Sequence, residues 1–392
     1  MRMKRLFYSR SLRSKLKYFL VIFVLCFAYF FGVFTHVFEK DYFSDFTYPL
    51  EGDIVEYANQ LKNNRKPDEA PINEYNFSYL YNAKGKCSMA DKEKIRLVIL
   101  VKSAIKHFKR RLVIRHSWGY ESRFSDVAIR TVFILGVGTD EKLQHKVDQE
   151  NETFGDIVQA NFTDTYYNNT IKTMMGFKWA VLNCPNAMFY FFSDDDMYVS
   201  TKNILRFVRN PTNYPAYLQQ AIVSLNSSHD LPRSNNHIDK EALLVKEDRI
   251  SNRKLQQVLD YQLPENVSLY SGYVFFSSPL RHLTSKWYVS LEEYPFHMWP
   301  PYVAAGAYVV SHEALLDMYY GSFFTKHFRF DDVYLGIVAK KMDVEPFHCP
   351  EFYFYKKNYI KDDYKYVIAS HGYDNPEELL AIWNEQRSSG NA

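Results

Sequence analysis

The sequence is short of cysteine, glycine and proline, and each shortage excludes a class of protein. Only 4 cysteines occur among 392 residues, which excludes a fold held together by many disulfides. The 14 glycines and 15 prolines exclude a collagen-like repeat and long low-complexity linkers. With 47% apolar and 24% charged residues, the chain has the composition of a globular protein that buries a large core.

The chain also lacks a positive surplus beyond its first residues. Its formal net charge is +3, but residues 1–17 hold seven basic side chains and no acidic one. Subtracting these seven charges from +3 leaves a net charge of −4 for all later residues. Because a nucleic-acid-binding protein needs a basic face, we do not expect nucleic acid as a partner.

An uncharged run of 21 residues, 18–38, follows this basic segment and contains no Asp, Glu, Lys or Arg. A helix of that length crosses the hydrocarbon core of a bilayer. Glu39 and Asp41 follow the run, so the positive-inside rule predicts a cytosolic tail (1–17), a transmembrane signal-anchor (18–38) and a luminal remainder. The alternative is a cleaved signal peptide, although the run lacks the small-residue cleavage site that such a peptide needs.

Sequons and cysteines agree with a luminal body. Six Asn-x-Ser/Thr sequons are candidate N-glycosylation sites: Asn76, Asn151, Asn161, Asn168, Asn226 and Asn266. Cys26 lies inside the 18–38 run, which leaves Cys87, Cys184 and Cys349. An odd number permits at most one intramolecular disulfide, and the sequence leaves its pairing open.

The luminal part divides into a stem and an α/β domain. Residues 39–94 are polar, show no sustained periodicity and are assigned to a stem. From 95 onward, apolar runs of strand length occur at 95–101, 130–136, 156–162 and 188–192. Apolar residues recur at helical spacing over 170–184, with Asn169 as the expected N-cap. Apolar strands that alternate with helices indicate a mostly parallel sheet covered on both faces.

The second half of the domain begins with a polar insertion at about 210–267. Strands are expected at 269–276 and 302–310, and helices at 312–320 and 331–341. A last helix is expected to begin within Asp374-Asn375-Pro376, since Asn or Asp suits the cap and Pro the first helical position.

An acidic triplet, Asp194-Asp195-Asp196, directly follows the 188–192 strand. Ligands of open α/β sheets bind beyond the carboxyl ends of the strands, and carboxylates there suit Mg²⁺ or Mn²⁺ that in turn bind phosphates. For a luminal enzyme this indicates a nucleotide-sugar substrate. The alternative is a solvated turn after a strand.

Three further positions have both a functional and a structural interpretation. Asp331-Asp332 starts a helix, so Asp331 can act as a cap while Asp332 faces the cleft. His371 is either a nitrogen ligand of the metal or a core histidine. Lys102, at the end of the first strand, either contacts the donor or is an exposed lysine without a role.

The motifs together resemble the β1,3-glycosyltransferase family, which includes β1,3-galactosyl- and β1,3-N-acetylglucosaminyltransferases, and most of all its brainiac-type members. The likeness covers about 95–209 and 268–387. It rests on a series in one order: Arg111-x-x-Ile114-Arg115-His116-Ser117-Trp118-Gly119, 132–136, Gly155-Asp156-Ile157, 169–173, the Asp triplet, Pro300-Pro301-Tyr302 and Asp331-Asp332-Val333-Tyr334. Within the series, 285–303 and 328–339 look brainiac-specific.

The resemblance implies a GT-A type domain over 95–392, inverting transfer from a UDP-sugar, and a Golgi membrane protein of type II topology. It implies Asp332 as catalytic base. The expected nucleotide-binding residues are Lys102, Arg111, Arg115, Asp194 and Asp195, and the expected ligands of Mn²⁺ or Mg²⁺ are Asp194, Asp196 and His371. The expected acceptor-binding residues are Trp287, Tyr288, Trp299, Tyr302 and Asp331, with core packing as the alternative for the aromatic ones.

The resemblance further implies UDP-N-acetylglucosamine as donor and a mannosyl glycolipid of glycosphingolipid synthesis as acceptor. One alternative is a β1,3-galactosyl- or N-acetylgalactosaminyltransferase acting on glycolipid or glycoprotein. Another is a non-catalytic glycan-binding protein or chaperone of the lumen. The sequence departs from the brainiac pattern in the long 210–267 insertion, in Asn161 at a usually acidic position, and in Gln386 where a cysteine that would partner Cys349 is usual.

Overall fold

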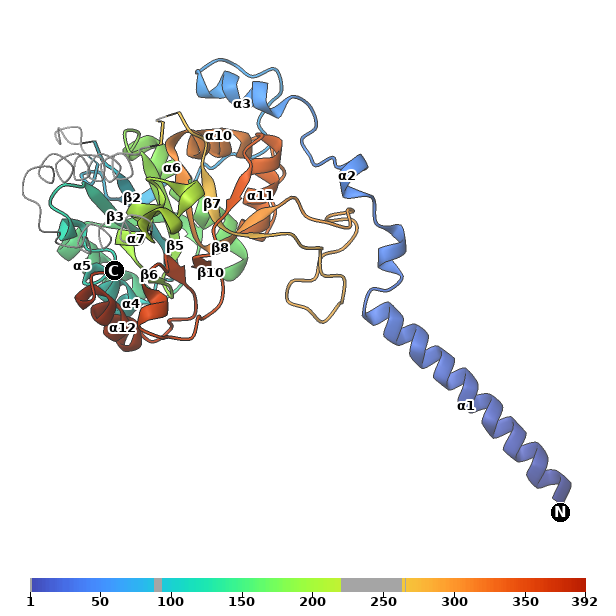
Figure 1. Ribbon diagram of the computed structural model, residues 1–392. Coiled ribbons are helices and arrows are strands. Elements are labelled where there is room, and N and C mark those ends of the chain that lie inside the picture. The colour runs from blue at the N-terminus through green and yellow to red at the C-terminus, as the bar shows by residue number, and fades with distance from the viewer. Residues whose placement is uncertain (1, 88–93, 220–262, 265) are drawn as a thin grey trace, which may run out of the picture.

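The structure is a computed structural model that describes residues 2–87, 94–219, 263–264 and 266–392. The expected insertion at 210–267 and the sequon at Asn226 fall mostly or wholly outside these described residues. Figure 1 shows one α/β body with a long helix, α1 (Arg2–Phe30), leading away from it.

The body is built on an eight-stranded sheet with the order β1-β4-β3-β2-β5-β8-β7-β9. Its strands are β1 (Tyr79–Asn82), β2 (Leu97–Lys102), β3 (Ile129–Val137), β4 (Ile157–Thr163), β5 (Phe189–Asp194), β7 (Tyr270–Phe275), β8 (Tyr302–Ser311) and β9 (Pro346–His348). Strands β4, β3, β2 and β5 pair in parallel, whereas β8 is antiparallel to both β5 and β7. The expectation of a mostly parallel mixed sheet in an α/β fold is confirmed.

Helices cover both faces of this sheet. They are α4 (Phe108–Arg115), α5 (Glu141–Phe154), α6 (Asn169–Asn183), α7 (Thr201–Phe207), α10 (His312–Ser322), α11 (Asp331–Lys341) and α12 (Pro376–Ser388). Along β2, Val98 and Leu100 point into the core under α6, α10 and α11, while Leu97, Ile99 and Val101 point into the core under α4, α7 and α12. Burial on both faces explains why the strand reads as one continuous apolar run.

A small sheet of β10 (Phe352–Tyr353), β11 (Ala369–Ser370) and β6 (Tyr198–Val199) brings the residues after Ser370 next to the acidic triplet. The backbone N–H of Tyr373 donates to the carbonyl of Asp196 at 2.8 Å. Of the two expected cap residues of α12, Asn375 is the cap, and its side chain accepts from the N–H of Glu377. The expected cap of α6 was wrong by one residue, because Asn169 is already helical and Asn168 precedes it.

The segment assigned to a stem contributes ordered elements to the body. It contains α2 (Tyr42–Asp45), α3 (Ile54–Lys62) and β1, which pairs antiparallel with β4. The indole N–H of Trp179 donates to the carbonyl of Asn82 at 2.6 Å, and Cys87 is joined to Cys184 by a disulfide. Cys349 is buried and free. These elements are too short to show periodicity in sequence, so it is tertiary packing that defines them.

The expected membrane-spanning helix over 18–38 is a prediction that the structure corrects. Helix α1 ends at Phe30, Gly32 has a left-handed φ of +74°, and a separate 3₁₀ helix covers Thr35–Phe38. The 21-residue run is therefore divided: residues 18–30 belong to α1, and the rest of the run lies outside that helix. No helix in the described part of the chain combines the length and the apolar character needed to cross a bilayer.

Candidate active site

Two adjoining cavities of about 530 Å³ and about 290 Å³ lie at the ends of β2 and β5 and the start of α11. Asp194 and Asp332 line both of them. The residues that also line both cavities are Tyr166, Phe275, Trp287, Ala305 and Phe354. The volumes suit small-molecule substrates, and the position at strand carboxyl ends is where open α/β sheets bind ligands.

A buried lysine joins the two sides of the site. Lys102 ends β2 directly opposite Asp194, the last residue of β5. Its ammonium nitrogen lies 3.1 Å from Asp194 Oδ1 and 2.8 Å from Asp331 Oδ2, and Thr173 donates to the same Asp331 oxygen at 2.9 Å. The two carboxylates raise the pKa of Lys102 above its ordinary value in spite of burial. Lys102 is thus neither exposed nor unpartnered.

Asp331 and Asp332 begin α11 but have opposite environments. Burial raises the pKa of Asp331, but Lys102 and Thr173 outweigh this effect and hold it below its usual range. Asp332 lacks such partners, and burial next to the Asp331 charge raises its pKa to about 7. A carboxyl that titrates near neutrality and faces a cavity has the properties of a general base.

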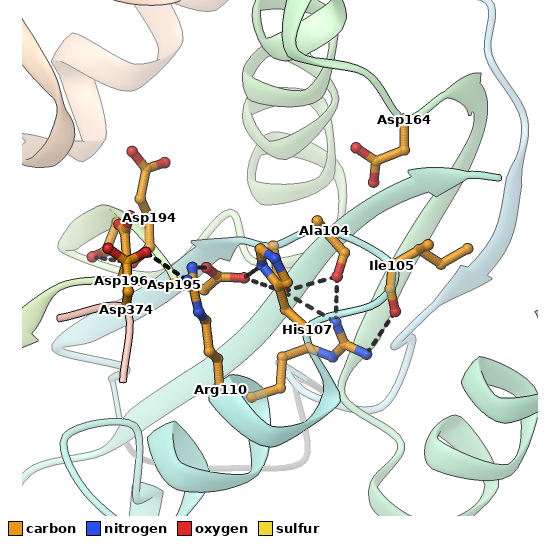
Figure 2. A network of polar contacts seen from close by, with 12 residues as sticks. Ala104, Ile105, His107, Arg110, Asp164, Asp194, Asp195, Asp196 and Asp374 are labelled. Atoms are coloured by element: carbon orange, nitrogen blue, oxygen red, sulfur yellow. Dashed lines mark hydrogen bonds and ion pairs between the residues drawn. The ribbon is translucent and has the colours of Figure 1, made fainter. Parts of the chain in front are cut away.

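The middle aspartate of the triplet is tied into the protein (Figure 2). Its carboxylate accepts from Ser103 Oγ at 2.6 Å and from Arg110 at 2.8 Å, and lies 2.8 Å from His107 Nδ1. These three contacts outweigh the effect of burial and lower the pKa of Asp195. In Figure 2 the Asp194 carboxylate points away from this group, as the alternation of side chains along a strand requires. The structure therefore places Asp195 in an internal network and not on the cavity wall.

Asp196 and His371 meet on the other side of the triplet. His371 Nε2 lies 3.5 Å from Asp196 Oδ2, and Asp196 Oδ1 is buried without a hydrogen-bond partner. Burial raises the pKa of Asp196. A Cβ atom placed on Gly306 would lie 3.8 Å from Asp194 Oδ2 and 3.6 Å from His371 Cδ2, so the absence of a side chain at Gly306 keeps space free between these two groups.

The expected metal ligands fit a cation in part. Within the described ranges, no group of three or more His, Cys, Asp or Glu side chains is arranged to hold a metal ion. However, Mg²⁺ is typically bound by one or two carboxylates together with substrate phosphates. The unpartnered oxygen of Asp196 beside His371 is the feature of this site that suits such a cation.

The two expected nucleotide-binding arginines lie in an interior network and line neither cavity. Arg111 donates to both Glu150 oxygens, the nearer at 2.6 Å, and to the carbonyls of Ala104 and Ile105. Arg115 donates to Glu150 at 2.7 Å and to both Asp156 oxygens at 2.8 Å. All of these donors are used inside the protein.

The expected acceptor-binding residues are divided among different environments. Trp287 is 46% exposed and lines both cavities, and its indole N–H donates to Tyr166 Oη at 3.2 Å. Tyr302 and the buried Trp299 line the larger cavity. Tyr288 lines neither, and its carbonyl accepts from Arg329, which does line the larger one. Asp331 is on the wall, but its carboxylate is held by Lys102.

Sequence reasoning missed much of the aromatic wall. Phe275 stacks on Tyr302 at 5.3 Å and packs edge-on against Phe354 at 4.8 Å. Tyr166 and Phe354 belong to no motif, so no sequence signal distinguished them from the other 66 of the chain's 68 aromatic residues. Among the sequons, Asn76, Asn161 and Asn266 are exposed, and Asn151 and Asn168 are half-buried.

Comparison with known proteins identifies the family of the chain. The family model described as Galactosyltransferase matches residues 109–249 and 231–350. The beta-1,3-galactosyltransferase brn of Drosophila melanogaster is 40% identical over 362 residues, which is 92% of each chain. Beta-1,3-galactosyltransferase 1 of Mus musculus is 29% identical over 318 residues, 81% of each chain. The chain belongs to the galactosyltransferase family and is a β1,3-glycosyltransferase.

Proposed function

We propose that this glycosyltransferase inverts the anomeric centre of a UDP-sugar and joins the sugar to the 3-hydroxyl of a glycan acceptor. The observation that carries the proposal is the placement of Asp332 and Asp194 on the shared wall of the two cavities. One of these carboxyls can serve the acceptor hydroxyl and the other the diphosphate side of the donor. The relative arrangement suits a single displacement.

In this reaction Asp332 takes the proton of the acceptor hydroxyl as general base. The acceptor oxygen then forms a bond to the anomeric carbon while the bond from that carbon to the UDP oxygen breaks, and UDP leaves with the electron pair. The pKa of Asp332, about 7, supports this role, because about half of the Asp332 carboxyl groups are then ionised at neutral pH. The wall of Trp287, Tyr302 and Phe275 offers apolar faces against which sugar rings can pack.

We propose that Asp196 and His371, with Asp194 beside them, hold Mn²⁺ or Mg²⁺. A cation there supplies charge neutralisation to the departing diphosphate. The unpartnered Asp196 oxygen supports this assignment. Burial and the charges of Asp196 and Asp331 raise the pKa of Asp194 to about 6, although Lys102 acts in the opposite direction. Because negative charges crowd this carboxylate, a cation beside it would stabilise its ionised form.

For the donor we propose UDP-N-acetylglucosamine and for the acceptor a mannosyl glycolipid, on the brainiac-type resemblance. UDP-galactose is the second candidate, favoured by the name beta-1,3-galactosyltransferase that the relatives carry. We place the reaction in the Golgi lumen. The Cys87–Cys184 disulfide supports a location in the secretory pathway, because disulfides persist in oxidising compartments.

The test uses the full chain, purified and given UDP-N-acetylglucosamine, UDP-galactose or UDP-N-acetylgalactosamine with a mannosyl-glucosyl acceptor. We expect the sugar of one donor to be transferred, and the activity to disappear in chelator and return with Mn²⁺.

The variant Asp332→Asn should bind UDP but lose transfer by about 10²–10⁴-fold. The matched variant Asp362→Asn, at an exposed position, should keep its transfer activity. Acceptor binding without transfer from any UDP-sugar would favour the glycan-binding alternative and refute the proposal.

A further inference from the structure

Lys102 is at the centre of the buried contacts that join β5, β8 and α11. Its ammonium nitrogen donates to Asp331 Oδ2 at 2.8 Å and to the carbonyl of Ala305 at 3.1 Å, and lies 3.1 Å from Asp194 Oδ1. An ammonium group has three protons to donate, and these three acceptors account for all of them. The side chain is 4% exposed, so no proton is left for a substrate oxygen.

The three acceptors come from three separate elements around the cavities. Asp194 ends β5, Ala305 lies within β8, and Asp331 is the first residue of α11. Asp194 and Ala305 line both cavities. Asp332, the proposed base, follows Asp331 directly, so a contact that fixes Asp331 also fixes the place where the base leaves the helix. Thr173, from α6, holds the same Asp331 oxygen from the other side.

We propose that Lys102 is a positioning residue that sets the start of α11 against the end of β5, and not a ligand of the donor. Without its ammonium group, the carboxylates of the buried Asp331 and the partly exposed Asp194 would lie near each other with no positive charge between them. A buried carboxylate in that state turns toward water or another donor. Asp331 would then move, and Asp332 would move with it away from the acceptor hydroxyl. This inference rests on the proposed function, since it takes Asp332 as the base.

The test is a double-mutant cycle of Lys102→Met and Asp331→Asn in the full chain, with transfer kinetics, thermal unfolding and calorimetric titration of UDP. Lys102→Met should lower kcat by about 10²-fold, the scale of a misplaced catalytic group. It should leave the affinity for UDP in chelator unchanged, because the proposed role of Asp194 toward UDP is exerted through the cation. Adding Asp331→Asn to Lys102→Met should cause no further loss of kcat, because Lys102 acts through Asp331. The double variant also removes the buried Asp331 charge that Lys102→Met leaves unpaired. If Lys102→Met alone does not fold, the kcat of the double variant therefore still tests the positioning role.

Lys341→Met is the matched control. Lys341 also donates three hydrogen bonds, to the carbonyls of Tyr48, Leu50 and Phe324, but at the far end of α11. This variant should lower the unfolding temperature and leave kcat per folded molecule unchanged. If the wild type transfers sugar, weaker UDP binding by Lys102→Met in chelator, or kcat losses that add in the cycle, would overturn the positioning role. If the wild type transfers no sugar, the proposed function itself has failed.

Discussion

The acidic residues of this protein fall into two regions that differ in how well each carboxylate is partnered. In the interior network, Asp195 and Glu150 each accept from two or more side chains, and Asp156 accepts two hydrogen bonds from Arg115. Asp332 on the cavity wall and Asp196 beside His371, which lines the smaller cavity, have few partners, and burial raises their pKa values. Residue type alone therefore does not distinguish a structural carboxylate from one available to a substrate or cation, whereas the number of hydrogen-bond donors around the carboxylate does.

The difference arises between neighbours in sequence. Asp194, at the end of β5, lines both cavities and Asp196 lies beside His371, while Asp195 is tied into the interior network. At the start of α11, Asp331 is neutralised by Lys102 and Asp332 is not. In each acidic run, one carboxylate fixes the backbone and an adjacent one is left available. This division lets a site hold reactive carboxyl groups without losing its geometry.

The largest expected effect comes from the interior network. Arg111→Met should lower the free energy of unfolding by about 3 kcal/mol, because it removes a fully buried partner of Glu150 and leaves that carboxylate with Arg115 alone. Urea denaturation measures this change, and transfer activity per folded molecule should stay near that of wild type. Adding Glu150→Gln should recover part of the loss. A stable Arg111→Met chain with weakened UDP binding would instead place Arg111 at the donor.

The second prediction concerns pH and the cavity wall. With the pKa of Asp332 at about 7, a protonated base cannot accept the acceptor proton, so kcat/KM should fall about tenfold per pH unit below neutrality. Above pH 7 the carboxyl is ionised and the rate should level off. A pH–rate profile over the range in which the chain stays folded measures the midpoint. A midpoint near pH 4 would mean that Asp332 is an ordinary solvated carboxyl.

The third prediction is a gain of stability on the cavity wall. The pKa of Asp194 is raised from 3.8 to about 6, so between these pH values the native state holds more protons than the unfolded state, and stability falls as pH rises. Asp194→Asn should abolish this loss. At pH 7 in chelator it should raise the free energy of unfolding by about 1 kcal/mol, a value reduced for a side chain that is one third exposed. Thermal melts of wild type and Asp194→Asn at pH 4 and pH 7 test this prediction. An equal difference in stability between the two proteins at both pH values would contradict it.

Much of the fold follows from sequence because β2, β3, β4 and β5 are buried on both faces and read as apolar runs. Helix α11 was predicted to the residue, since two acids and two lysines mark its ends. Segment 39–82 was not predicted, because α3 and β1 are stabilised by contacts with α10 and β4 from distant parts of the chain. The end of α1 at Phe30 was also missed, since an apolar run gives no sign of where its helix stops.

The site was predictable to the level of its acidic motifs but not to the level of individual roles. Strand ends and helix starts predicted that Asp194 and Asp332 lie near a common cleft. Nothing in sequence shows that Asp195 contacts His107 and Arg110, or that Lys102 is buried. Those contacts join residues 85 to 229 positions apart, and only the assembled fold defines them.

The smallest expected effect tests the comparison at the edge of the interior network, where Arg110 bridges Asp195 and Asp374. The Arg110–Asp374 contact is the shorter, 2.6 Å against 2.8 Å, but Asp374 is 75% exposed and Asp195 only 5%. If burial decides what an ion pair contributes, Asp374→Asn should change the free energy of unfolding by about 0.5 kcal/mol or less. Arg110→Met, which strips a partner from the buried Asp195, should cost several times more. Equal losses in the two variants would mean that contact distance, and not burial, sets the contribution of these carboxylates.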